Sequence, residues 1–392
     1  MSLIATSERP FELRPFQRAA LSALAEPGHV ICVSRTGSGK SLIYERAARQ
    51  PGRRTLLVSP LIALAFQQRE RLRAAGLRVK MGSGGSAERP ESGTQAWIVS
   101  PETLRYAAYQ SALESWKPDF LVVDECHCLW DWGDGFRPDF LALPDLIPRL
   151  GIPRSLWLTA TLPVDARREL RSRLPSRVRE LGRFELPSGL HLEVKRVEWK
   201  DRCEALLNWI EGQGEHGIVF VSTREQVSRV ARLLTARGHP NSSYHAGLSR
   251  EERRLIEARV AARRSGIIVA TSAFGMGMDH SHLAWTVLWQ APSSLLGMTQ
   301  AIGRVGRSEF QGRALVFWDF EDFRLLDWSA RGSKRRETTL SETLEYLKTP
   351  ACRKRGLEEY YEGNSTLTVS SRCCDFCDSI PLHPRKSTQV VY

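Results

Sequence analysis

The sequence has 392 residues, of which 42% are hydrophobic and 26% are charged, and its formal net charge is +12. These values exclude a disordered chain and predict a soluble globular protein of two or three domains. No apolar run approaches the roughly 20 residues that cross a bilayer, and the amino terminus lacks the basic head and apolar core of a secretion signal. The positive charge is spread along the chain, which suits either a protein that binds a polyanion across several domains or an arginine-rich solvated surface.

The first candidate for ligand binding is the segment 13–17, which reads LRPFQ. The amide of Gln17 both donates and accepts hydrogen bonds, so it can recognise the edge of an adenine. Arg14 or Phe11 could stack on the same base. The alternative is an ordinary surface glutamine, so this segment points to a nucleotide only if a phosphate site lies nearby.

A glycine-rich loop follows, between an apolar run at 30–33 and a helix-like run at 42–49. The loop contains Thr36, Gly37, Ser38, Gly39, Lys40 and Ser41. Glycines allow the tight turn that points backbone N–H groups at a phosphate, and the start of the helix adds a partial positive charge. Lys40 can then reach terminal phosphates, and Ser41 can ligate Mg²⁺. The order of strand, loop and helix predicts a nucleotide site rather than a tight turn with a surface lysine.

Apolar strands alternate with helices through the first half of the chain. Strands are predicted at 56–59, 97–100, 121–123, 156–158 and 178–184, and helices follow the first two of them. This alternation implies right-handed crossovers and a parallel sheet, which binds ligands at the carboxyl ends of its strands. Residues 187–189 read as a linker.

Two acidic residues, Asp124 and Glu125, follow the strand predicted at 121–123. They therefore stand at the phosphate end of the predicted sheet. Asp124 can hold Mg²⁺ directly or through water, and Glu125 can orient and deprotonate an attacking water. Together with the glycine-rich loop, this pair predicts nucleotide hydrolysis.

The segment 128–138 reads CLWDWGDGFRP and is predicted to be a loop. Its Trp132, Phe136 and Arg137 lie among glycines and aspartates. Aromatic side chains in an exposed loop can stack on unpaired bases. The alternative is an aromatic cluster that fixes the loop to the core.

A second block of strands and helices begins near residue 190, with strands predicted at 218–221, 267–270 and 287–289. This block has no phosphate loop of its own. Arg304 and Arg307 stand three residues apart beside glycines, so we expect two cations on one side of a helix, suited to the charge that grows on a γ-phosphate. Surface solvation is the alternative for both. A nucleotide site completed by arginines from a second block is the design of a nucleotide-driven motor.

Taken in order, these motifs resemble those of the superfamily-2 helicases, and specifically those of the RecQ family. The similarity runs from about residue 11 to residue 378 and includes TGSGKS, SPLIALAFQQ, DECHCLWDWGDGFRPDF, LTATLP, YHAGLS, IIVATSAFGMGMD and QAIGRVGR. The run DECH followed by W-G-x-x-F-R-P is highly specific for RecQ. The resemblance implies an α/β fold with two tandem RecA-like parallel-sheet lobes, at 1–187 and 188–331. A small zinc-binding helical subdomain and tail are implied at 332–392.

The resemblance also implies an activity, which is ATP-dependent 3′→5′ movement on single-stranded DNA with duplex unwinding in repair, recombination or replication. It implies adenine recognition by Gln17 with Arg14, phosphate and Mg²⁺ binding by Lys40, Ser41 and Asp124, and water activation by Glu125. Arginine fingers are implied at Arg304 and Arg307, and DNA contacts at Trp132, Phe136, Arg137, Thr223, Arg224 and Thr271. We expect a cytoplasmic, chromosome-associated monomer that binds single-stranded, forked or tailed DNA and other repair or replication proteins. Asp134 and Asp279 depart from the histidine and asparagine usual in the family.

Four cysteines lie near the end of the chain, at Cys352, Cys373, Cys374 and Cys377. Four thiolates can form a tetrahedral zinc site. The spacing is not a clean pair of CxxC hooks, but it resembles the RecQ zinc subdomain, in which one helical cysteine joins a cluster of three. Free or redox-active thiols are the alternative. The scattered Cys32, Cys126, Cys128 and Cys203 are expected to pack as small apolar residues in a reducing compartment.

Only 14 residues, 379–392, follow Asp378, the residue after the last cysteine. A winged-helix domain and a terminal helical DNA-binding domain do not fit in so short a segment, so efficient ATP hydrolysis with weak unwinding of long duplexes is expected. One rival within the enzymes is an RNA helicase or a translocase that does not unwind DNA efficiently. Another is a non-catalytic DNA-binding relic, against which the intact Lys40, Glu125 and Arg307 argue.

Overall fold

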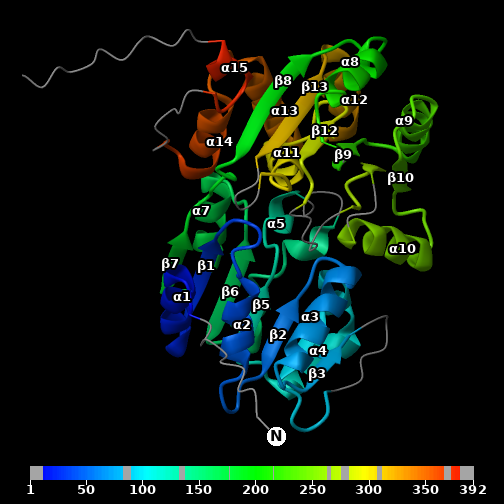
Figure 1. Cartoon of the computed structure of the whole chain (residues 1–392). Helices are drawn as coiled ribbons and strands as arrows, with labels where there is room; N and C mark the ends of the chain where they lie inside the picture. Colours follow the sequence, from blue (N-terminus) through cyan, green and yellow to red (C-terminus); the bar gives the residue numbers. More distant parts are fainter. Residues whose placement is uncertain are drawn as a thin grey trace, which may run out of the picture. The chain divides into compact units, whose positions relative to one another are not determined.

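The computed structural model describes residues 12–82, 90–131, 137–175, 177–214, 216–262, 266–274, 282–306, 311–365 and 372–379. The chain forms two compact units, Met1–Arg183 and Phe184–Tyr392, each built around its own parallel sheet (Figure 1). Among the described helices, none has the length and apolarity needed to cross a membrane.

The amino-terminal unit contains a parallel sheet with the strand order β3-β4-β2-β5-β6-β1-β7. The strands are β1 (Gly28–Val33), β2 (Thr55–Val58), β3 (Val79–Met81), β4 (Ala96–Val99), β5 (Phe120–Val123), β6 (Arg154–Thr159) and β7 (Val178–Gly182). The helices are α1 (Pro15–Ala25), α2 (Ser41–Ala48), α3 (Ile62–Ala74), η1 (Pro101–Arg105), α4 (Ala107–Trp116), α5 (Cys128–Asp131), η2 (Pro138–Phe140), α6 (Leu146–Leu150) and α7 (Val164–Arg173). The predicted strands, including the closing strand β7, are confirmed.

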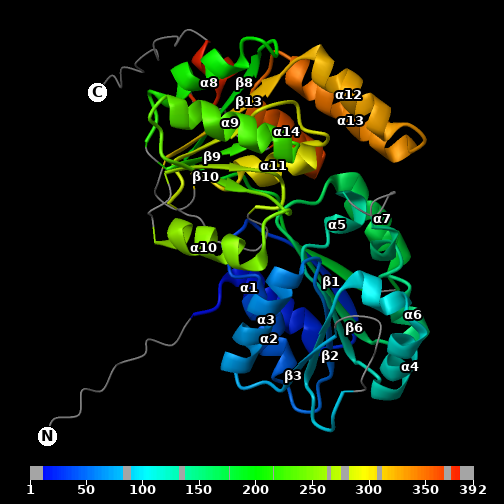
Figure 2. The ribbon, with the colours of Figure 1, turned by 90° about the vertical axis from the view of Figure 1, so that its right-hand side faces the viewer.

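The inner strands β2, β4 and β5 of this sheet are fully buried apolar runs because helices cover both faces. Alternate residues of β1 point into two different cores, with Ile31 and Val33 in one and Val30 and Cys32 in the other. Figure 2 shows α1, α2 and α3 on one face of the sheet and α4, α6 and α7 on the other. The carboxyl ends of β1, β2, β5 and β6 consequently meet at one edge, and the segments that follow them build the candidate site.

The second unit contains a parallel sheet with the strand order β10-β11-β9-β12-β13-β8. The strands are β8 (Leu190–Arg196), β9 (Gly217–Phe220), β10 (Asn241–Tyr244), β11 (Ile267–Ala270), β12 (Trp285–Leu288) and β13 (Gly312–Trp318). The helices are α8 (Arg202–Ile210), α9 (Arg224–Ala236), α10 (Arg250–Ala261), α11 (Leu295–Ile302), α12 (Phe320–Ala330), α13 (Lys334–Lys348), α14 (Arg353–Glu362) and α15 (Asp375–Asp378). A bidentate ion pair with no solvent exposure, between Arg202 and Asp322, joins α8 to α12 at 2.8 and 3.0 Å.

The cysteine-bearing segment belongs to this second unit and shares its core. Cys374 forms a parallel bridge with Leu192 of β8, and the backbone N–H of Leu192 donates to the carbonyl of Cys373 at 3.3 Å. The ring of Tyr361 in α14 stacks on Phe184, with 4.0 Å between ring centroids. Edge strand β8 is therefore covered by the cysteine segment.

Two local predictions differ from the structure. The segment that begins at Cys128 starts as the short helix α5 rather than as a loop, because the N–H groups of Cys128 and Leu129 bond to the carbonyls of Glu125 and Cys126. Arg304 was expected on a helix with Arg307, but α11 ends at Ile302. Gly303 caps that helix, so Arg304 lies in the turn that follows.

Candidate functional site

The glycine-rich loop between β1 and α2 has the backbone that its sequence predicts. Gly37 and Gly39 have φ angles of 77° and 85°, a region that side chains with a Cβ rarely adopt. Ser41 is the first residue of α2, so the positive end of that helix faces the loop. The ammonium of Lys40 donates to the carbonyls of Ser34 at 2.6 Å and Arg35 at 3.1 Å. The loop thus holds its lysine and presents exposed Thr36 and Gly37, whereas Ser38 is buried.

Gln17 in α1 is tied directly to this loop. Its side chain is buried, with Oε1 accepting from the N–H of Arg14 at 2.8 Å and Nε2 donating to the carbonyl of Gly39 at 2.9 Å. A Cβ on residue 39 would come within 2.7 Å of the Gln17 amide nitrogen, so a glycine is needed at this position. The surface-glutamine alternative is therefore wrong, and Gln17 couples the start of α1 to the phosphate loop.

The two acids after β5 have different surroundings. Asp124 is 7% exposed; its Oδ2 accepts from Nε2 of Gln68 at 2.7 Å and its Oδ1 accepts from the N–H of Glu125 at 3.0 Å. Burial, followed by the charge of Glu125, raises the pKa of Asp124 to about 6, although Lys40 opposes the shift. Glu125 has a φ of 51°, which costs a non-glycine residue of order 1–2 kcal/mol. Such strain is typical of functional sites.

The side chain of Glu125 faces a buried histidine. Its Oε2 lies 3.3 Å from Nδ1 of His127, and the same nitrogen lies 2.9 Å from Oγ1 of Thr159 at the end of β6. The Thr159 hydroxyl donates to the carbonyl of Thr161 at 3.0 Å, so we assign the proton between His127 and Thr159 to the histidine nitrogen. His127 therefore links Glu125 to the threonine-rich end of β6 and is not a member of any metal-ligand cluster among the described residues.

The predicted DNA-binding Arg137 is held by groups of its own unit. Its guanidinium donates to the carbonyl of Pro60 at 2.6 Å, bonds to the carboxylate of Glu102, and lies 4.8 Å from the ring centroid of Phe140. Nearby, Nε1 of Trp130 donates to Glu169 at 2.9 Å, and its ring packs against the core. For Trp130 the alternative reading, an aromatic that anchors the segment, is therefore confirmed. Several predicted residues lie outside the described residues, namely Phe11, Trp132, Asp134, Phe136, Asp279 and Arg307.

The predicted DNA-binding residues of the second unit follow the carboxyl ends of its strands, whereas Arg304 follows helix α11. Thr223 caps α9 after β9, its hydroxyl accepting from the N–H of Gln226 at 3.1 Å, and Arg224 is exposed at the start of that helix. Thr271 follows β11, and its N–H donates to the carbonyl of Tyr244 at 3.1 Å. Arg304 is 8% exposed, and its guanidinium carbon lies 5.7 Å from the ring centroid of Phe220.

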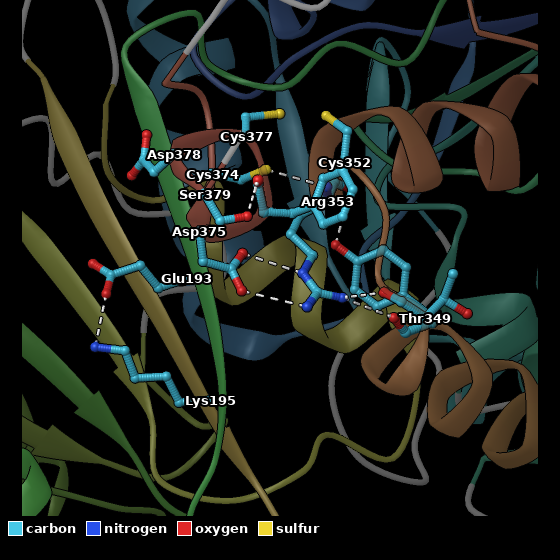
Figure 3. Close-up of polar contacts among 12 residues, drawn as sticks. Glu193, Lys195, Thr349, Cys352, Arg353, Cys374, Asp375, Cys377, Asp378 and Ser379 are labelled. Atoms are coloured by element: carbon cyan, nitrogen blue, oxygen red, sulfur yellow. Dashed lines mark hydrogen bonds and ion pairs between the residues drawn. The ribbon is translucent and has the colours of Figure 1, made fainter. Parts of the chain in front are cut away.

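The four carboxyl-terminal cysteines form a compact buried cluster. The sulfurs of Cys352, Cys373, Cys374 and Cys377 all lie within 4.8 Å of one another. Cys374 Sγ also accepts from the N–H of Arg353 at 3.4 Å, and the Arg353 guanidinium pairs with Asp375 (Figure 3). Cys352 directly precedes α14, Cys373 and Cys374 precede α15, and Cys377 lies in α15. Sulfurs this close can surround one tetrahedral metal ion, and four thiolates are a donor set that zinc accepts.

Sequence reasoning missed two polar residues of the site, Gln68 and Thr159. Gln68 stands beside Gln67 in the motif SPLIALAFQQ. The only sequence signal that distinguishes the two residues is the helical period, which places Gln68 on the buried face of α3 with Leu64 and Leu72. Thr159 lies in the motif LTATLP, directly after the strand predicted at 156–158, and no partner was predicted for it. The contact with His127 could not be read from the sequence, because 32 positions separate the two residues.

Comparison of the sequence and the fold with known proteins identifies the class of protein to which this chain belongs. Residues 14–170 match the family described as DEAD/DEAH box helicase, and residues 201–309 match the family described as helicase conserved C-terminal domain. A structure of Dbp5 from Saccharomyces cerevisiae bound to RNA and ADP BeF3 is 20% identical with a TM-score of 0.64, covering 85% of this chain and 87% of that one. A structure of the Mycobacterium smegmatis helicase Lhr bound to ssDNA and AMP-PNP is 21% identical with a TM-score of 0.62, covering 86% of this chain and 48% of that one. The fold and the two matches define the two-lobed core of a superfamily-2 helicase.

Similar curated proteins narrow this class. The ATP-dependent DNA helicase RecQ of Pasteurella multocida is 28% identical over 88% of this chain and 57% of its own length. The RecQ of Synechocystis is 31% identical over 71% of this chain and 62% of its own length. The ATP-dependent DNA helicase Q5 of Rattus norvegicus is 28% identical over 93% of this chain and 42% of its own length. The chain belongs to the RecQ-type helicases, and it spans about two fifths to three fifths of the length of these relatives.

Proposed function

We propose that this chain is an ATP-dependent DNA helicase that moves 3′→5′ along single-stranded DNA and acts in repair, recombination or replication. The observation that carries the proposal is the edge of the first sheet, where Lys40, Ser41, Asp124 and Glu125 follow the ends of β1 and β5. The DNA substrate and the ATP dependence are proposed by similarity to the RecQ relatives, which are ATP-dependent DNA helicases.

Nucleotide binding would use the loop and the helix that follows it. The N–H groups around Gly37 and Gly39 and the start of α2 suit the phosphates, and Lys40 would exchange its carbonyl partners for phosphate oxygens. Gln17, with Arg14, would bind the adenine. The hydrogen bond from Gln17 to the carbonyl of Gly39 would couple this binding to the conformation of the phosphate loop. Ser41 and Asp124 would hold Mg²⁺, which supplies charge neutralisation to the phosphates.

Hydrolysis would depend on Glu125 as the base for the attacking water. The Glu125 side chain is 23% exposed, so a water molecule can reach it, and the buried His127 faces its carboxylate. The Nδ1–H of His127 can orient the carboxylate without taking its proton. We propose that Arg304 and Arg307 act as arginine fingers, so that hydrolysis between the two lobes drives movement.

DNA binding would use the residues that follow strand ends in both units. These are Trp132, Phe136 and Arg137 of the first unit and Thr223, Arg224 and Thr271 of the second. We further propose the lobe boundaries 1–187 and 188–331, with a zinc subdomain at 332–392 in which Cys352, Cys373, Cys374 and Cys377 hold one Zn²⁺. The metal would stabilise the segment that covers β8, because binding energy becomes folding energy in so small a unit.

The test of this function is the steady-state ATPase rate with no nucleic acid, with single-stranded DNA and with single-stranded RNA of equal length. We expect strong stimulation by DNA and little by RNA, with Lys40→Ala inactive in all three conditions. Equal stimulation by both would favour the rival RNA helicase or a non-unwinding translocase. A wild-type rate no higher than that of Lys40→Ala would leave only the non-catalytic relic.

A further inference from the structure

Gln68 is a polar residue on a helix face that is otherwise apolar. The buried residues of α3 are Leu64, Ala65, Gln68 and Leu72, which recur at the spacing of one helix face. Gln68 is 3% exposed. Burying an amide is costly unless its donors and acceptors find partners, so its presence on this face calls for a specific contact.

One end of the Gln68 amide has such a contact. Its Nε2 donates to Oδ2 of Asp124 at 2.7 Å, while Oδ1 of Asp124 accepts from the N–H of Glu125 at 3.0 Å. A carboxylate only accepts, so the amide nitrogen must be the end that faces Asp124. The carboxylate is therefore held from both sides, and its orientation is set by α3 as well as by β5.

The other end of the amide is unmatched. Oε1 of Gln68 is buried and accepts no hydrogen bond from the described residues. The nitrogen facing Asp124 fixes this oxygen next to the same carboxylate. Mg²⁺ in proteins keeps several of its waters and is held by only one or two carboxylates, and such waters are strong hydrogen-bond donors. An unmatched acceptor beside a metal-binding carboxylate suits a metal-bound water.

We propose that Gln68 is a positioning residue of the Mg²⁺ site, which orients Asp124 through Nε2 and accepts a hydrogen bond from a metal-bound water through Oε1. This inference rests on the proposed role of Asp124 in the nucleotide site. Groups that orient a metal ligand typically change metal affinity ten- to a hundredfold when they are removed. Gln68 thus tunes metal binding without touching the nucleotide.

The test compares Gln68→Met with Gln67→Met, a matched change at the exposed neighbouring position. Mn²⁺ is titrated into the full chain with ADP, and bound metal is measured by electron paramagnetic resonance; ADP affinity is measured separately in EDTA. We expect metal binding to weaken about ten- to a hundredfold in Gln68→Met, ADP affinity without metal to change less than about twofold, and Gln67→Met to match the wild type. If Gln68→Met does not fold, Gln68→Asn, which withdraws the amide by one methylene, should weaken metal binding in the same direction.

Unchanged Mn²⁺ affinity in Gln68→Met, or an equal loss of ADP affinity in EDTA, would overturn the proposal. The parallel variant Asp124→Asn separates this failure from a failure of the site itself. If Asp124→Asn also leaves Mn²⁺ binding unchanged, the proposed metal site is wrong. If Asp124→Asn weakens Mn²⁺ binding and Gln68→Met does not alter it, only the role of Gln68 fails.

Discussion

The pKa of Asp124 makes metal binding depend on pH in a range where few carboxylates titrate. Burial and the charge of Glu125 raise this pKa to about 6, from an ordinary value near 4. The metal requires the ionised carboxylate of Asp124. Metal affinity is therefore retained above pH 6 and lost as the pH falls through the pKa of Asp124. The ionised fraction is about ten elevenths at pH 7 and about one eleventh at pH 5, which predicts a roughly tenfold loss of metal affinity, or about 1.4 kcal/mol.

The assay is a Mn²⁺ titration of the protein with ADP between pH 5 and pH 8, repeated with Asp124→Asn. An asparagine does not ionise, so the ratio of the two affinities removes the nucleotide's own protonation. We expect the ratio to fall about tenfold from pH 7 to pH 5, because only the wild type loses a charge at this position. Parallel curves for the two proteins would refute the reasoning, since Asp124 would then neither bind the metal nor titrate in this range.

Three further predictions concern other parts of the molecule. Glu125→Gln should lower ATP turnover by at least about a hundredfold while ADP affinity is unchanged, and near-normal turnover would sink its role as the base. Elemental analysis of reduced protein should find one zinc ion per chain, lost in Cys377→Ser; zinc absent from the wild type would contradict the cluster's role. Asp322→Leu should lower the free energy of unfolding of the second unit, measured in urea, by about 3–5 kcal/mol, because Arg202 is left as an uncompensated buried charge. Adding Arg202→Met should restore part of this loss, because the N–H groups of Ala291 and Asp319 still lack the carboxylate that accepts from them. Equal losses in the single and double variants would count against this explanation.

The strands and the phosphate loop could be predicted because each depends on local sequence. Buried parallel strands are continuous apolar runs, and the loop needs glycines at positive φ, which Gly37 and Gly39 supply. The cysteine cluster was predictable in outline because the four residues share one chemistry. Their packing onto β8, through the bridge between Cys374 and Leu192, joins segments about 180 positions apart and has no sequence signal.

The remaining features depend on contacts that form only in the folded chain. A short apolar and aromatic segment such as the one after Glu125 is compatible with either a helix or a loop. It forms the helix α5 because its backbone N–H groups donate hydrogen bonds to carbonyls of the preceding turn. The position of Arg304 depends on where α11 ends, which Gly303 decides. Gln68 looks like its neighbour Gln67 until α3 is placed against β5, so its bond to Asp124 could be found only in three dimensions.

The central claim, that this RecQ-type chain is a DNA helicase with 3′→5′ polarity, is tested most directly by strand displacement. Two duplexes of the same sequence, one with a 3′ single-stranded tail and one with a 5′ tail, are incubated with the wild type and with Lys40→Ala, with and without ATP. We predict that the strand is released only from the 3′-tailed duplex, only when ATP is present, and only by the wild type and not by Lys40→Ala. Release from the 5′-tailed duplex, or equal release without ATP, would contradict the account.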